Sequence, residues 1–215
     1  MLKESQSDYW NKYYSKNQAP QEPSLFALWV SNLMSVDDVV LDIGCGNGRD
    51  TFFLSQHCQK VSGIDRSDEA INANNGKIKS ELNISFHKCD VENHEELQAI
   101  MLEGKYNVVY SRFFLHSISD LVCSKLLSDS LMMMPSGGCV YLEYRTDRDP
   151  LMKAGQILSE SERVTDHYRR FINHRSFLNQ IQKIGWLIKF EQEDFGLAVY
   201  NDQDPCVGRL VLERP

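Results

Sequence analysis

The sequence predicts an α/β protein built on a doubly wound, mostly parallel sheet. Short apolar runs rich in β-branched residues alternate with amphipathic stretches, and a glycine-rich turn follows the first run. The expected strands are Val39–Ile43, Lys60–Ile64, Ile84–Lys88, Tyr106–Tyr110, Cys139–Tyr144, Leu187–Gln192 and Gly208–Glu213. Helical patterns cover Arg49–Cys58, Ser67–Glu81, His94–Leu102, Leu121–Met134 and Ser176–Ile184. Because a helix follows each of the first four strands, right-handed crossovers would place helices on both faces of the sheet.

Size and charge limit the class of protein. The chain has 215 residues, of which 42% are hydrophobic and 25% charged, as in an ordinary globular protein. It has no internal repeat or Pro/Gly/Ser linker, so we expect a single domain over residues 1–215. The formal net charge of -7 has the wrong sign for binding nucleic acid through its phosphates. We therefore expect no nucleic-acid partner; a small-molecule acceptor is expected from the arginines described below.

The cysteines and the N-terminus indicate the compartment. Six cysteines are scattered singly without C-x-x-C pairs, so neither a disulfide framework nor a structural zinc site is expected. The N-terminus lacks the apolar core of a signal peptide, and no apolar run reaches membrane-spanning length. We expect a cytoplasmic protein with reduced thiols and neither a metal nor a membrane partner. The apolar segment Leu25–Met34 fits a monomer's core or a homodimer interface equally well.

Two segments lie outside the alternation of strands and helices. Residues 1–35 form an N-terminal cap, in which Trp10, Tyr13 and Tyr14 could act as a flap over a ligand or simply bury the apolar face of a helix. Residues 145–173 form a long, highly charged excursion between the fifth and sixth strands. Excursions of this length in compact domains are usually lids or binding segments.

The turn after the first strand is the strongest signal of a ligand. Its glycines fall at 44, 46 and 48, and Arg49 stands where the dinucleotide fingerprint requires Gly or Ala. A nicotinamide cofactor is therefore disfavoured. Asp42 just before the turn would repel a pyrophosphate and attract an ammonium group.

Carboxylates also end the next two strands. Asp65 lies 65 − 44 = 21 residues after the first glycine, the spacing at which an acidic residue reaches a ribose diol. Asp90 and apolar Val91 close the third strand, where a carboxylate can accept from an adenine amine. Each feature alone could be an ordinary turn or a helix cap. Together with Ser111 after the fourth strand, they form an ordered set on four consecutive strand ends, which favours a nucleoside-bearing cofactor.

These motifs, from Asp42-Ile-Gly-Cys-Gly-Asn-Gly48 to Ser111, resemble those of class I S-adenosylmethionine-dependent methyltransferases. The resemblance implies a Rossmann-like seven-stranded sheet in the order 3-2-1-4-5-7-6 with strand 7 antiparallel, and S-adenosylmethionine as methyl donor. It also implies that the turn lines the methionyl tail, Asp65 takes the ribose, Asp90 and Val91 take the adenine, and the Ser111 carbonyl holds the amino group. The implied cofactor set is Trp10, Tyr14, Asp42, Gly44, Cys45, Gly46, Gly48, Asp65, Arg66, Asp90, Val91 and Ser111.

The acceptor side is read from the residues after the fourth strand and from the excursion. The Asn-Pro-Pro-Tyr type of motif used on amide and amine nitrogens is absent, which disfavours methylation of DNA bases or glutamine. His116 and His167 are the candidate bases, although a single histidine is more often a packed residue. Arginines concentrated with aromatic residues predict an anionic acceptor, because guanidinium forks bind phosphate or carboxylate. The expected acceptor ligands are Arg112, Arg145, Tyr168, Arg169 and Arg170.

Other interpretations stay open. The arginines could equally lie on a solvated helical face and be neutralised by nearby acids such as Asp149 and Asp166. Blocks including Tyr9–Tyr14 and Thr165–Phe171 resemble bacterial methyltransferases of capsule and surface-polysaccharide clusters, linked to O-methyl phosphoramidate modification. That resemblance implies O-methylation of a phosphorylated or phosphoramidate-bearing sugar. A non-catalytic S-adenosylmethionine-binding subunit and a methyltransferase of RNA or protein are the alternatives.

Overall fold

The structure is a computed structural model that describes residues 2–16, 19–78 and 83–215, with side chains from Asp8 onward. The expected helix Ser67–Glu81 is shorter in the structure, where it ends at Asn75, and residues 79–82 lie outside the described residues. Within these ranges, no helix is long and apolar enough to cross a membrane.

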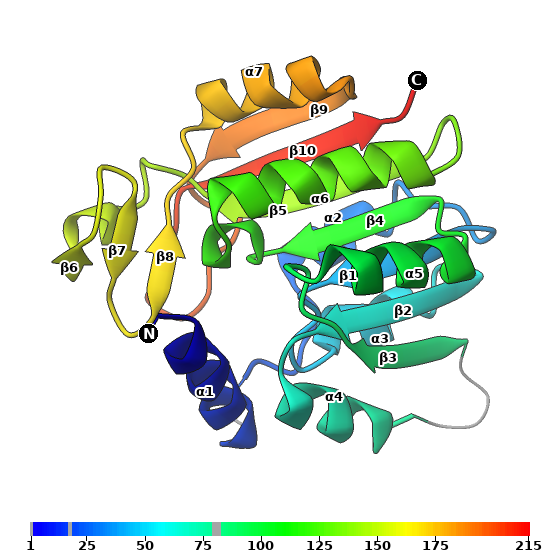
Figure 1. Cartoon of the computed structure of the whole chain (residues 1–215), viewed down its shortest axis with the longest axis horizontal. Coiled ribbons are helices and arrows are strands. Elements are labelled where there is room, and N and C mark those ends of the chain that lie inside the picture. The colour runs from blue at the N-terminus through cyan, green and yellow to red at the C-terminus, as the bar shows by residue number, and fades with distance from the viewer. Residues whose placement is uncertain (1, 17–18, 79–82) are drawn as a thin grey trace. The chain divides into compact units, whose positions relative to one another are not determined.

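A seven-stranded sheet in the order β3-β2-β1-β4-β5-β10-β9 organises the chain (Figure 1). Strand β10 runs antiparallel to both β5 and β9, whereas β1 is parallel to β2 and β4. The expected order and the antiparallel last strand are confirmed. The strands are β1 (Val39–Ile43), β2 (Lys60–Asp65), β3 (Ile84–Lys88), β4 (Val108–Arg112), β5 (Cys139–Arg145), β9 (Leu187–Asp194) and β10 (Val207–Glu213).

By its internal contacts the chain divides into two compact units, Met1–Tyr110 and Ser111–Pro215, with the boundary inside β4. The single domain expected from the sequence remains a prediction. Each unit is described below by itself.

The first unit has helices on both faces of its strands. Figure 1 shows α5 in front of these strands and α3 behind them. Helix α4 contacts β2 and β3, and α1 contacts α4. The apolar side chains of β1, Val40, Leu41 and Ile43, are fully buried, which is typical of a central parallel strand. The helices are α1 (Leu2–Ser15), α2 (Leu25–Val30), α3 (Arg49–Leu54), α4 (Asp68–Asn75) and α5 (His94–Gly104).

Strand β4 begins two residues later than the sequence predicts. The Asn107 side chain is the physical reason: its Oδ1 accepts from Val39 N at 2.7 Å, and its Nδ2 donates to Asp38 Oδ1 at 2.8 Å. Asn107 thus hydrogen-bonds to the residues at the start of β1, and β4 begins at the next residue. Strand β4 also ends two residues later than expected, so Ser111 and Arg112 lie within the strand rather than after it.

The second unit packs helices α6 (Asp120–Met133) and α7 (His174–Ile184) against each other, and α7 also contacts β9 (Figure 1). Trp186 lies between α7 and β9 and is buried. Its indole Nε1 donates to the Leu127 carbonyl of α6 at 3.0 Å, which joins this connection to α6. A one-turn helix η1 (Leu115–Ser117) follows β4.

The excursion 145–173 folds as a small antiparallel sheet, not as a helical face. Its strands are β6 (Gln156–Ile157), β7 (Glu162–Val164) and β8 (Tyr168–Arg170), preceded by a short helix η2 (Pro150–Lys153). Buried Arg163 holds it together, because its guanidinium donates to the carbonyls of Met152 at 2.8 Å and Ser159 at 2.6 Å. The alternative of a solvated helical face is therefore wrong in its geometry.

We expect Arg163→Met to lower the free energy of unfolding by about 2–3 kcal/mol, since a buried charged donor to several carbonyls is removed. Urea denaturation measures the loss. Arg175→Met, at an exposed position of α7, is the matched control and should change stability by less than about 0.5 kcal/mol. Equal effects of the two substitutions would show that Arg163 does not organise the excursion.

Candidate functional site

The glycine-rich turn sits directly on the end of β2. Gly44, Gly46 and Gly48 all have positive φ angles, of 78°, 52° and 75°, which favour glycine. The N–H groups of Gly44 and Cys45 both donate to the Ile64 carbonyl, at 2.8 and 3.0 Å. The turn is therefore held in place by its own backbone donors before any ligand is considered.

Tyr14 of α1 covers this turn. A Cβ atom at Gly46 would overlap the Tyr14 hydroxyl, so the ring lies against the glycine backbone. Burial, followed by the charge of Asp65, raises the pKa of Tyr14 well above its usual range. Trp10 stacks on Tyr14 with ring centroids 6.0 Å apart, and Asn11 Oδ1 accepts from Ser67 Oγ at 2.7 Å. Helix α1 thus lies where a flap was expected; its contact with a cofactor remains a prediction.

Asp65 joins the turn to the start of α4. Its Oδ2 accepts from Gly46 N at 3.0 Å and its Oδ1 accepts from Ser67 N at 2.9 Å. Burial raises the pKa of Asp65, and these two backbone donors oppose that rise. The helix cap itself is Ser67, whose Oγ accepts from Ala70 N at 3.2 Å. Asp65 is therefore a bridge between two loops at the end of β2.

Asp90, Val91 and Arg66 lie together after β3 and β2. The Asp90 side chain is 42% exposed and pairs with Arg66 Nη2 at 3.4 Å, while Val91 is buried. Strands β2 and β3 are parallel neighbours, with Asp65 in register with Lys88. The carboxylates of Asp65 and Asp90 therefore follow adjacent strand ends, as the sequence predicts.

Asp42 lies just before the turn, as expected, but its side chain points to α3. It is 2% exposed, and its Oδ2 accepts from Thr51 Oγ1 of α3 at 2.6 Å. Burial raises the pKa of Asp42 to about 8, although the Thr51 hydrogen bond lowers it. The side chain is therefore largely protonated at neutral pH, which removes the electrostatic reason for a direct attraction to an ammonium group.

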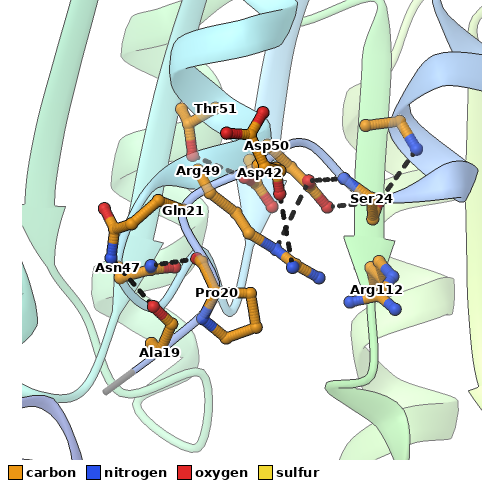
Figure 2. A network of polar contacts seen from close by, with 12 residues as sticks. Ala19, Pro20, Gln21, Ser24, Asp42, Asn47, Arg49, Asp50, Thr51 and Arg112 are labelled. Atoms are coloured by element: carbon orange, nitrogen blue, oxygen red, sulfur yellow. Dashed lines mark hydrogen bonds and ion pairs between the residues drawn. The ribbon is translucent and has the colours of Figure 1, made fainter. Parts of the chain in front are cut away.

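A buried network that the sequence analysis missed fixes the loop 19–24 beside the turn (Figure 2). The Asp50 carboxylate accepts from Ser24 N at 2.8 Å, from Ser24 Oγ at 2.7 Å and from the Tyr110 hydroxyl at 2.8 Å. Asn47 Nδ2 donates to the Pro20 carbonyl at 2.7 Å. An acidic residue in the first turn of a helix is common, so nothing in the sequence distinguishes Asp50 as a hub.

Asn74 is a second missed residue. It is fully buried, and its Nδ2 donates to the Gly46 carbonyl at 2.8 Å, while its Oδ1 has no hydrogen-bond partner among the described residues. Its signal in the sequence is a polar residue four positions after Ala70, on the apolar face of the predicted helix. The site thus offers oxygen acceptors at Asp65, Asp90 and Asn74, a set that fits the hydroxyl and amine donors of S-adenosylmethionine.

In the second unit, Glu143 is the centre of a buried charge cluster. It is 0% exposed, and its two oxygens accept from Arg112 Nε and Arg209 Nε, each at 2.8 Å. Ser111 is buried beside Arg112 in β4. The expected acceptor ligand Arg112 is thus already paired through its Nε.

Phe113 is held in a strained conformation between two guanidinium groups. Its φ of 53° is rare for a bulky residue, and its N–H donates to the Glu143 carbonyl at 2.8 Å. The guanidinium carbons of Arg112 and Arg145 lie 4.2 and 5.2 Å from its ring centroid. Strain of this kind is often found at functional sites.

The cations of the excursion have local acidic partners, as the alternative interpretation expected. Arg145 Nη1 pairs with Asp149 at 2.5 Å, Arg169 pairs with Asp166, and the Tyr168 hydroxyl donates to Glu162. Arg145, Asp149 and Arg169 are nevertheless buried and Tyr168 is half-buried, whereas Asp166 is exposed. The Nε of Arg169 has no hydrogen-bond partner among the described residues.

Arg170 has a protein partner on every guanidinium nitrogen. Its Nε donates to the Ile118 carbonyl at 3.0 Å, its Nη2 to the Leu115 carbonyl at 3.2 Å, and its Nη1 to Asp120 at 3.1 Å. The expected role of Arg170 as an acceptor ligand would require breaking this arrangement.

Both candidate bases are buried and have lowered pKa values. Burial, followed by Arg145 and Arg169, holds the pKa of His116 well below its usual range. Burial, followed by Arg169, lowers the pKa of His167 to about 4, although Asp166 opposes this shift. His167 Nδ1 lies 3.1 Å from Asp166 Oδ2. His116 Nδ1 has no hydrogen-bond partner among the described residues.

In the described ranges, no group of three or more His, Cys, Asp or Glu side chains could hold a metal ion.

Comparison with known proteins supports the chemistry implied by the motifs. Residues 40–138 match a family model described as a methyltransferase domain. An uncharacterized methyltransferase of Schizosaccharomyces pombe is 34% identical over 113 residues, covering 52% of this chain and 41% of that protein. A protein of invertebrate iridescent virus 6, named "Putative methyltransferase 235L", is 29% identical over 183 residues, covering 80% of this chain and 62% of that protein. The chain spans less than two thirds of the length of either relative.

A solved structure supports the fold over almost the full length. The S-adenosylmethionine-dependent methyltransferase from Anabaena variabilis matches with a TM-score of 0.74 and 21% identity, covering 97% of this chain and 95% of that one. The fold expected from the sequence is confirmed, and residues 40–138 match the model of a methyltransferase domain.

The raised pKa of Asp42 predicts how stability depends on pH in the cofactor-free protein. Between pH 4 and pH 8 the unfolded chain releases the proton that the folded chain keeps, so the free energy of unfolding falls as pH rises. The slope from this one group is at most about 1.4 kcal/mol per pH unit. Asp42→Asn should flatten the dependence in urea denaturation at pH 5, 6 and 7.

The exposed neighbour variant Asp37→Asn provides the control and should leave the slope unchanged. Parallel curves for wild type and Asp42→Asn would mean that Asp42 is ionised in the folded state.

Proposed function

We propose that this chain, whose residues 40–138 match a methyltransferase domain, transfers a methyl group from S-adenosylmethionine to a small anionic acceptor. The observation that carries the first part is the ordered set of a glycine turn and two carboxylates on successive strand ends within the matched region. When bound, S-adenosylmethionine supplies an electrophilic methyl group.

On the cofactor side, four residues have the proposed roles. Asp65 accepts from the ribose hydroxyls and Asp90 accepts from the adenine amine. The turn around Gly46 positions the methionyl tail, and Tyr14 excludes water from it. This assignment agrees with the chemistry of the side chains, since carboxylates only accept hydrogen bonds and the adenosine offers donors.

The anionic acceptor is proposed from an imbalance of buried charge. In residues 111–215, all of which the structure describes, five arginines are buried but only three carboxylates. The arginines are Arg145, Arg163, Arg169, Arg170 and Arg209, and the carboxylates are Asp129, Glu143 and Asp149.

Other acidic partners lie in water. Asp120 and Asp166 have side chains that are 65% and 56% exposed, so solvent screens them more than the arginines. Buried positive charge therefore exceeds buried negative charge in this unit, and after burial itself the arginines add to the lowering of both histidine pKa values. A phosphorylated or phosphoramidate-bearing sugar, acted on during surface-polysaccharide synthesis, is the narrower proposal. It rests on the sequence resemblance alone.

The cofactor assignment is tested by calorimetric titration with S-adenosylhomocysteine. Wild type should bind, and Asp65→Asn should weaken binding at least about tenfold, or about 1.4 kcal/mol, because a charged acceptor of the ribose is lost. Asp68→Asn, a nearby exposed position paired with Lys88, should leave the affinity within about twofold. Thermal unfolding of each variant checks that it folds. Absence of binding to the wild type would refute the cofactor assignment.

The acceptor class is tested by product formation with matched pairs of sugars. Glucose 6-phosphate and glucuronate should be methylated with a kcat/KM at least about 100-fold above that of glucose, since charge recognition by guanidinium groups is lost with the neutral sugar. A sugar phosphoramidate tests the narrower class. The preference should shrink as salt increases. Equal rates with charged and neutral sugars would contradict an anionic acceptor, and binding without any turnover would favour a non-catalytic subunit.

A further inference from the structure

His116 combines a suitable position in the sheet with an unsatisfied nitrogen. Helix η1 (Leu115–Ser117) follows the carboxyl end of β4, and ligands of open α/β sheets bind beyond the carboxyl ends of strands. His116 is 4% exposed, and its Nδ1 has no hydrogen-bond partner among the described residues. Buried polar atoms in proteins are nearly always satisfied, so this nitrogen requires a partner from elsewhere, and that partner is a donor when the ring proton is on Nε2. The hydroxyl of an acceptor is such a donor.

Arg170 holds the turn that carries His116. Its Nε and Nη2 donate to the carbonyls of Ile118 and Leu115, at 3.0 and 3.2 Å. These carbonyls lie on either side of His116 in the chain. Because the guanidinium is a rigid planar fork, the two bonds fix the position of η1 relative to β8. A lysine could reach only one carbonyl at a time.

We infer that His116 Nδ1 receives the acceptor's proton during methyl transfer, and that Arg170 is the positioning residue that holds His116. This inference rests on the proposed function. The acceptor oxygen forms a bond to the methyl carbon, and the bond from that carbon to the sulfonium sulfur breaks with its electron pair going to sulfur. The hydroxyl proton moves to His116 Nδ1, and water later removes it.

The charges around His116 are consistent with a base that responds to an anion. Arg145 of β5, Arg169 and Arg170 of β8, and His167 before β8 face it, with Asp149, Asp166 and Asp120 as acidic partners of the arginines. Burial, followed by these cations, keeps the pKa of His116 well below its usual range, so the imidazole of the free protein is neutral but only weakly basic. An anionic acceptor would offset the cations and strengthen the base when it binds.

His167 differs from His116 in its place in the fold. It comes just before β8 of the small sheet, and its Nδ1 lies 3.1 Å from the Asp166 carboxylate. His116 instead follows the carboxyl end of β4, a strand of the central sheet, where ligands of open α/β sheets bind. This position is the reason to choose His116.

The first test measures turnover of the sugars named above by four variants. His116→Gln should lower kcat by at least about 100-fold, with the affinity for S-adenosylhomocysteine unchanged. Arg170→Met should lower kcat about tenfold and leave KM within about threefold, because it disturbs only the position of the base. It should also move the acid limb of the kcat profile to higher pH, since a nearby cation is removed. Arg170→Lys should recover part of the loss, and exposed Arg175→Met should behave as wild type.

The second test needs no acceptor. Histidine ¹⁵N resonances of the free protein, assigned for His116 by its loss in His116→Gln, should report a neutral ring from pH 8 down to pH 5.5. In Arg170→Met the same resonance should titrate at higher pH. A His116 ring that is protonated at pH 7 would overturn the inference whatever the acceptor.

The outcomes separate this inference from the proposed function. Normal turnover of an anionic sugar by His116→Gln overturns the role of His116 and leaves the proposed function standing. Turnover of only neutral sugars, abolished in His116→Gln, supports His116 and overturns the anionic acceptor. No turnover of any sugar by wild type that binds S-adenosylhomocysteine overturns both. If Arg170→Met weakens binding of the acceptor and leaves kcat unchanged, Arg170 is an acceptor ligand and not a positioning residue.

Discussion

The cofactor side of this protein depends on one carboxylate that serves two loops. Asp65 accepts from the backbone of Gly46 and of Ser67, and so fixes the glycine turn after β1 relative to the start of α4. The Ile64 carbonyl beside it accepts from Gly44 and Cys45, which seats the same turn on β2. Because the donors of the turn are used internally, its shape is set before a ligand arrives. A ligand is then recognised chiefly by side-chain acceptors and by shape, which is how preorganised sites limit the entropy lost on binding.

In the second unit, buried arginines outnumber buried carboxylates. Glu143 is fully buried yet tied to two arginines, and further buried arginines have carboxylate partners that reach into water. Burying a cation is costly unless it is paired and hydrogen-bonded, so these guanidiniums bind carbonyls as well as acids. Arg163 and Arg170 show this most clearly, since each organises a turn of backbone. Arginine in this unit is thus a structural element and a source of positive potential at once.

Much of the fold and of the candidate cofactor site could be predicted from the sequence, because hydrophobic periodicity and the residues at strand ends are local signals. The strands, the glycine turn and the carboxylates at positions 65 and 90 follow from such patterns, whereas the strand order is implied by the family that the motifs resemble. What could not be read depends on partners far apart in the chain. The protonation of Asp42 is set by burial beside Thr51, the network at Asp50 joins Ser24 to Tyr110, and the guanidinium of Arg170 closes on carbonyls more than fifty residues earlier. Composition shows that arginines are present, but only packing shows which of them are already engaged.

A structure of the protein crystallised with S-adenosylhomocysteine tests the central claim most directly. The account predicts that the ribose hydroxyls lie within hydrogen-bond distance of the Asp65 carboxylate, with the adenine amine at Asp90 and the amino-acid tail along the turn around Gly46. A nucleoside bound elsewhere in the chain, or one whose ribose makes no contact with Asp65, would contradict it.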